Sequence, residues 1–242
     1  MKRFIFLLTL ISTAALAQTH RSAPNDSFAS DRQTIPVVAN VTGFGGAQFT
    51  SYVALFNPTS STIAVTASFF DGSGTRSDRV ISLGPSQVLT YTNFLNQAFG
   101  VTGGGAVRLT TGDPNSRIIV NSEVRSGGYS TTVPVLEFAG SSSRSFAPGI
   151  TVDSTSRTNV GCVDQSGNGN TVTATIRDTL GGNLGTITLN LAPNAWGQTG
   201  VNTPVSNGYV QFDPSDNAVC YAVVVNNATN DGRFISAAEY RP

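Results

Sequence analysis

The sequence predicts an all-β protein built from two tandem antiparallel β-sandwiches. Residues 51–57 (SYVALFN) and 65–71 (VTASFFD) return about 107 positions later as residues 158–164 (TNVGCVD) and 172–178 (VTATIRD), which indicates two copies of one module. Apolar and polar residues alternate within these segments, and clusters of Gly, Asn, Asp and Ser separate them, as in half-buried strands joined by turns. No long helical pattern interrupts the strands, which argues against a parallel α/β fold.

The N-terminus has the features of an export signal. Lys2 and Arg3 precede an apolar run, and the small-residue pattern that ends at Ala17 predicts cleavage there, so residues 1–17 form a signal peptide. The apolar run is shorter than the roughly 20 residues that span a bilayer, so we expect no membrane span. Residues 18–34 are polar and are expected to form a flexible leader. The mature protein is therefore predicted to be secreted, or to be retained in the periplasm or at the cell surface.

The first predicted β-sandwich domain covers residues 35–140. Its clearest strand places Ile63, Val65, Ala67 and Phe69 on one face, and a turn is expected to follow at residues 71–74. A single short helix is predicted, at residues 93–99 (NFLNQAF).

The second predicted β-sandwich domain covers residues 141–242 and follows a Ser-rich linker at residues 140–143. Val172, Ala174 and Ile176 alternate with threonines in one of its strands, and a second alternating strand covers residues 186–191. We expect the two domains to unfold separately unless a large apolar interface joins them.

Two cysteines, Cys162 and Cys220, lie in an early and a late strand of the second domain. Alternation places both side chains inward, so in an exported protein they are predicted to form a disulfide between the two sheets. Two buried free thiols are the alternative. The first domain has Leu55 at the position of Cys162 and a residue near Ile118 at that of Cys220, so its core is expected to suffice without a crosslink.

Charge and composition exclude several functions. Removing Lys2 and Arg3 from 14 basic residues, against 14 acidic ones, leaves a net charge of about −2, which argues against binding to nucleic acid. The mature chain has no lysine, and its single histidine, His20, lies in the leader, so neither a Ser-His-Asp nor a Cys-His site can form on the folded body. We therefore predict that the protein is not an enzyme and needs no cofactor. A hydrolase that uses carboxylates such as Glu123 remains an alternative.

One segment has the spacing of a calcium loop. Asp164, Ser166, Asn168 and Asn170 place oxygen atoms on every second residue, as calcium loops do. The twelfth position is Thr175 rather than an acid, however, and a Gly- and Asn-rich hairpin turn explains the same pattern without metal.

Two aromatic residues are candidates for ligand contacts. Trp196 is the only tryptophan, and together with Tyr209 it could form a platform for a sugar. The alternative is that both side chains pack in the core, because aromatic residues dominate the cores of β-sandwiches.

A family resemblance supports the same fold. The segment IPVVAN at residues 35–40, the GFGG at residues 43–46, the YVALFNP at residues 52–58 and the RTNVG at residues 157–161 resemble exported proteins of soil bacteria with tandem immunoglobulin-like β-sandwich repeats. That group has no assigned activity, so the resemblance implies a fold and an extracellular location but no functional residue.

The function expected from the sequence is that of an exported non-catalytic module, structural, adhesive or interacting with other proteins. The expected partner is an unidentified surface protein or glycan. A carbohydrate-binding module is the first alternative, and the carboxylate hydrolase is the second.

Overall fold

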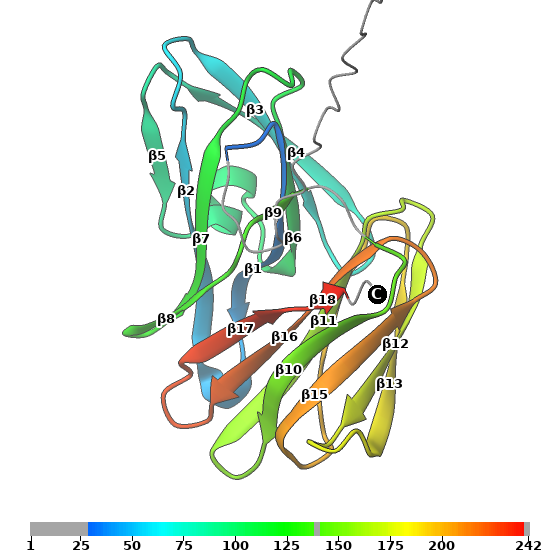
Figure 1. Cartoon of the computed structure of the whole chain (residues 1–242). Helices are drawn as coiled ribbons and strands as arrows, with labels where there is room; N and C mark the ends of the chain where they lie inside the picture. The colour runs from blue at the N-terminus through cyan, green and yellow to red at the C-terminus, as the bar shows by residue number, and fades with distance from the viewer. Residues whose placement is uncertain (1–28, 138–140, 240–242) are drawn as a thin grey trace, which may run out of the picture.

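The computed structural model describes residues 29–137 and 141–239, which are almost entirely antiparallel β-structure (Figure 1). The predicted signal peptide and most of the predicted leader lie outside these residues. We call residues 29–137 the first half and residues 141–239 the second half.

The first half forms two layers. Its strands are β1 (Arg32–Thr42), β2 (Gln48–Phe56), β3 (Ile63–Phe70), β4 (Arg76–Leu83), β5 (Val88–Tyr91), β6 (Gly103–Thr110), β7 (Ile119–Ser126), β8 (Tyr129–Thr132) and β9 (Leu136–Glu137). One layer has the order β4-β3-β6-β1-β9 and the other the order β5-β2-β7-β8. Strand β1 joins the layers, because it pairs with β6 along most of its length while its last three residues pair with β2.

The second half has two separate sheets. Its strands are β10 (Ser145–Val152), β11 (Ser156–Asp164), β12 (Asn170–Arg177), β13 (Asn183–Leu191), β14 (Trp196–Gly200), β15 (Val205–Pro214), β16 (Ala218–Asn226), β17 (Gly232–Ser236) and β18 (Ala238–Glu239). The orders are β13-β12-β15-β10-β18 and β14-β11-β16-β17.

These orders match those of the first half when each strand is compared with the one nine places later. The predicted all-β, antiparallel class is confirmed. The immunoglobulin-like order is not, because immunoglobulin domains place their first two strands in one sheet, whereas β1 and β2 belong mainly to opposite layers.

Alternation along the strands placed the core correctly. Val65, Ala67, Val172 and Ala174 are fully buried, and Phe69 is only 5% exposed. The predicted short helix is present as a π-helical turn, η2 (Leu95–Phe99), and a 3-10 turn, η1 (Phe44–Gly46), connects β1 to β2. Neither helix in the described ranges is long and apolar enough to cross a membrane.

The folded body begins earlier than the sequence indicated. Strand β1 starts at Arg32, inside the predicted leader, and Ser30 already pairs with Ile118. Gln33 and Thr34 are buried, and the Gln33 side-chain amide donates to the Ile118 carbonyl over 3.0 Å. The alternation of apolar and polar residues did not predict this part of β1, because its buried residues Gln33 and Thr34 are polar. Hydrogen bonds rather than apolar contacts complete the core there.

The predicted disulfide between Cys162 and Cys220 is present, but it does not link the two sheets. Strands β11 and β16 are neighbours in one sheet, and the two cysteines face each other across it with their Cα atoms 4.1 Å apart. In the first half the same positions hold Leu55 and Val120, which are both buried. Val120, rather than a residue near Ile118, is therefore the counterpart of Cys220.

Replacing Cys162 by Leu and Cys220 by Val would give the second half the apolar pair that the first half uses. We expect the free energy of unfolding in urea to fall by about 2–5 kcal/mol, because packing is retained while the constraint on a loop of 58 residues is lost. Reductant should destabilise the native protein by a similar amount and leave this variant unaffected. A variant as stable as the oxidised protein would show that the crosslink contributes nothing.

Candidate functional site

The two halves are joined by an aromatic group from the second half that is buried against the first. Tyr221 on β16 is fully buried and belongs to the hydrophobic core of the first half, where Trp196 and Phe234 also pack. The rings of Tyr221 and Phe234 are stacked, with centroids 4.8 Å apart. The predicted independent domains are therefore in apolar contact.

Two glycines make room for these rings. Gly161 lies opposite Tyr221 in the β11–β16 ladder, and a Cβ atom at position 161 would collide with the tyrosine ring. Gly104 on β6 lies beside the Trp196 ring, where a Cβ atom would come within 3.1 Å. The absence of two side chains thus allows Tyr221 and Trp196 to enter the interface.

A directional hydrogen-bond chain runs through the same group. Trp196 Nε1 can only donate, and it donates to Tyr221 Oη over 2.8 Å. Tyr221 then donates to Gln198 Oε1 over 3.0 Å. Burial raises the pKa of Tyr221, so the phenol keeps its proton at neutral pH. The chain fixes the orientation of the Gln198 amide, with its oxygen toward Tyr221 and its NH₂ group away from it.

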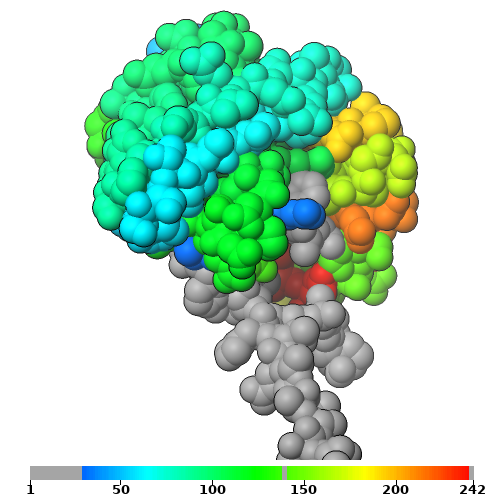
Figure 2. Space-filling model, turned by 90° about the horizontal axis from the view of Figure 1, so that it is seen from above, coloured from blue at the N-terminus to red at the C-terminus, as the bar shows by residue number. Residues whose placement is uncertain are grey.

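A second contact zone lies around Arg108 of β6. Its guanidinium donates to Asn194 Oδ1 over 2.7 Å and to the Asp164 carbonyl over 2.6 Å. Burial lowers the pKa of Arg108, although the nearby Asp164 carboxylate offsets part of this effect. The backbone N–H of Trp196 also donates to the Asp71 carbonyl over 3.2 Å. Figure 2 shows the cyan surface of the first half against the yellow surface of the second in this view.

The Asp164 carboxylate is occupied by protein donors. Its Oδ1 accepts bonds from the Ser166 N–H and hydroxyl, and its Oδ2 accepts bonds from the N–H groups of Gly167, Gly169 and Asn194. Burial alone would raise the pKa of Asp164, but these hydrogen bonds outweigh burial and lower it.

Several oxygens of the possible calcium loop of Asp164, Ser166, Asn168 and Asn170 already accept hydrogen bonds from the protein. The Asn170 side chain bonds to residues 215–217. The Ser166 oxygen accepts the Asn168 N–H. Throughout the described ranges, no group of three or more His, Cys, Asp or Glu residues is placed to hold a metal ion. The alternative explanation, a hairpin turn, is wrong as well, because this segment connects β11 to β12 in the other sheet and the two strands do not pair.

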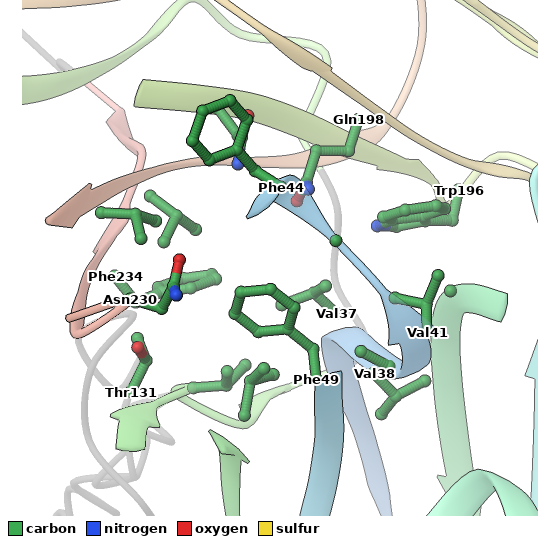
Figure 3. A pocket seen from close by; sticks show the side chains of 18 residues that line it. Val37, Val38, Val41, Phe44, Phe49, Thr131, Trp196, Gln198, Asn230 and Phe234 are labelled. Carbon is green, nitrogen blue, oxygen red and sulfur yellow. The ribbon is translucent and has the colours of Figure 1, made fainter. Parts of the chain in front are cut away.

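A cavity of about 270 Å³ lies between the halves (Figure 3). Strands from both halves form it, and most of its surface is apolar. The lining residues are Val37, Val38, Ala39, Val41, Gly43, Phe44, Phe49, Gly104, Val124, Thr131, Val133, Asn159, Trp196, Gln198, Val223, Val225, Asn230 and Phe234. None of these described residues is ionisable, so the lining offers no acid, base or nucleophilic thiol.

The rim of the cavity combines one residue from each half. Phe44 on η1 is 66% exposed, and the Arg157 guanidinium of β11 lies 5.1 Å from its ring centroid. Gly45 and Gly46 have φ angles of 68° and 79°, a region that side chains other than those of Gly, Asn and Asp rarely adopt. The glycine turn therefore holds Phe44 over the opening.

The two predicted ligand contacts do not lie together. Trp196 lines the cavity, whereas Tyr209 lies outside the lining and packs against Phe146, with ring centroids 6.1 Å apart. Glu123, the candidate acid of a hydrolase, pairs with Arg125 over 3.0 Å and does not line the cavity.

Sequence reasoning missed Phe44, Phe49, Phe234 and Gln198. A signal existed for Phe44, because the GFGG at residues 43–46 places a large aromatic residue among glycines. Phe49, Phe234 and Gln198 gave no such signal, because alternation alone does not tell a core residue from one that lines a cavity between halves.

No protein-family model matches this chain, and no curated protein matches it either. Its site can therefore be interpreted only from its geometry, which consists of an apolar cavity between two halves, aromatic walls and a few amide groups.

Replacing Asp164 by Asn should lower the free energy of unfolding at pH 7 by about 1–3 kcal/mol, because an amide cannot accept all five hydrogen bonds. The native pKa is lowered, so the stabilisation is complete above the unfolded value of about 3.9 and is lost as the pH falls through the native pKa. The difference in the free energy of unfolding between the native protein and Asp164→Asn should therefore be constant at pH 6–8 and shrink below about pH 4. Urea denaturation at each pH measures this difference.

Asp153 provides the matched control, because its carboxylate accepts the N–H groups of Thr155 and Ser156 in an exposed turn. Asp153→Asn should lower the free energy of unfolding by less than Asp164→Asn does. Equal effects for the two variants, or a difference for Asp164→Asn that persists at low pH, would contradict this account of Asp164.

Proposed function

We propose that this chain is an exported, non-catalytic protein-interaction module that binds an extended partner strand along the free edge of β13. The observation that carries the proposal is that β13 is a nine-residue edge strand (NLGTITLNL) without a charged residue or a proline. Within the described residues it pairs with β12 alone.

The counterpart of β13 in the first half is protected and β13 is not. Strand β4 occupies the same edge position and carries Arg76, Asp78 and Arg79. Charged side chains of this kind prevent edge strands from pairing with other chains. On β13 the outward positions are the exposed residues Thr186, Thr188 and Asn190. This contrast between matched edges favours a binding role for β13.

Export is part of the proposal and rests on two features. The signal-like residues 1–17 predict secretion, and the Cys162–Cys220 disulfide suits an oxidising compartment. A strand partner at the cell surface or outside the cell follows from both.

A catalytic role has less support. The cavity has no ionisable lining residue in the described structure. Asp71, Asp113, Asp153 and Asp164 each accept hydrogen bonds from nearby N–H groups in turns. These carboxylates therefore have a structural use in turns, which favours a structural over a catalytic role for them.

A carbohydrate-binding role also has less support. Of its two predicted aromatic residues, only Trp196 lines the cavity, and the walls around it are mostly valine and phenylalanine. Sugar hydroxyls buried against such walls would lack hydrogen-bond partners, which is costly.

The proposal can be tested with a photoreactive crosslinker at Thr188 and, as a control, at Val80. Thr188 pairs with Thr173 and Val80 pairs with Thr66, so the two residues hold equivalent edge positions in the two halves. On cells that export the protein, crosslinking from position 188 should join an extended segment of one partner, and position 80 should not reach it. Thr188→Lys should abolish binding of that partner, and Val80→Lys should leave it unchanged.

Hydrogen exchange of the isolated complex supplies a second readout. Binding by strand addition should slow exchange of β13 amides that bond to nothing in the free protein. Equal crosslinking from both positions, or unchanged exchange of β13 in the complex, would contradict the proposal.

A further inference from the structure

We infer that the cavity between the two halves is a binding site for a small, neutral, mostly apolar ring compound that carries one hydrogen-bond acceptor. An aromatic ketone is the simplest example of this class. The site is separate from the β13 edge, because the cavity lining includes no residue of β13. Ligand binding in the cavity and strand binding at β13 can therefore be tested independently.

Size and shape favour a single ring system. An apolar cavity of roughly 150 Å³ can hold benzene, and this cavity is larger, at about 270 Å³. Phe44, Phe49, Trp196 and Phe234 surround it (Figure 3), so a flat ligand can contact aromatic faces and edges.

The lining also selects for a neutral ligand. None of its residues, all of them in the described part of the chain, carries a charge. A buried charge without a partner is expensive. Arg157 lies at the rim, where it already bonds to Asn227 and Asn230, so carboxylates and amines of the same size should be rejected from the interior of the cavity. Sugars should be rejected as well, because most of the walls are apolar.

Gln198 supplies a polar contact at a defined position. The Tyr221 hydroxyl accepts a hydrogen bond from the Trp196 N–H and donates one to the Gln198 side-chain oxygen. The Gln198 NH₂ group is therefore left to donate a hydrogen bond to a ligand. Gln198 lines the cavity and projects between Phe44 and Trp196 in Figure 3. An acceptor on the ligand, such as a carbonyl oxygen, can therefore bond to it.

The rim offers an entrance. Phe44 is the most exposed of the lining aromatics at 66%, and its ring contacts Arg157 of the opposite half. The Arg157 guanidinium is itself held by Asn227 and Asn230 of the β16–β17 connection. Movement of Phe44 on its glycine turn would open the cavity without breaking the Tyr221 contact.

The single tryptophan makes the test direct, because Trp196 gives the only indole N–H resonance of the chain. The mature, oxidised protein labelled with nitrogen-15 is titrated with acetophenone, ethylbenzene, benzoate and methyl glucoside. Acetophenone should shift the Trp196 Nε1–H and Gln198 amide signals saturably, with a dissociation constant of about 0.1–10 mM for so small a ligand. Benzoate and methyl glucoside should give no saturable shift.

Gln198→Leu is the variant that tests the polar contact. It should raise the dissociation constant of acetophenone about tenfold, as expected for the loss of one hydrogen bond. The dissociation constant of ethylbenzene, which has no acceptor, should change by less than about twofold. Gln165→Leu is a control outside the cavity lining and should change neither affinity. Tight binding of methyl glucoside, an absence of saturable shifts with acetophenone, or an equal loss of both ring ligands in Gln198→Leu would overturn the inference.

Discussion

Tyr221 belongs to the second half of the chain by sequence and to the core of the first half by packing, and the rest of the structure depends on this burial. The phenol holds Trp196 and orients Gln198 through hydrogen bonds of 2.8 and 3.0 Å. It also stacks on Phe234, which forms a wall of the cavity. Tyr221 therefore contacts three residues that line the cavity, Trp196, Gln198 and Phe234.

The contact energies show why the halves form one body. Fully burying a large apolar side chain is worth about 1.5–3 kcal/mol. Tyr221 is fully buried against the first half, and Trp196 and Phe234 are partly buried there. Arg108 adds two hydrogen bonds to groups of the second half. The approach of Thr131 on β8 to Gly232 on β17 extends the contact to the edges of two sheets. These contacts favour a single folded body over two independent modules.

The alternation of apolar and polar residues correctly predicted which face of each strand is buried. A strand with one buried face repeats every second residue, so Val65 and Val172 could be placed in the core. The partner of each strand is a long-range property, and this is why the disulfide was predicted to link two sheets although it lies between neighbouring strands of one sheet. Trp196 was recognised as special only because it is unique in the chain. Phe234 and Gln198 line the cavity because the two halves pack against each other. The alternation of apolar and polar residues within either half does not predict that contact.

Native-state hydrogen exchange in low concentrations of urea tests most directly whether the halves form one body. Amides of β3 in the first half and of β12 in the second should exchange through the same global opening, with equal free energies and equal dependence on urea. Trp196 emission, which reports the interface, should change in the same transition. If β12 opened at a lower free energy than β3, while Trp196 became exposed with β12 alone, the two halves would be independent and the central role assigned to Tyr221 would be wrong.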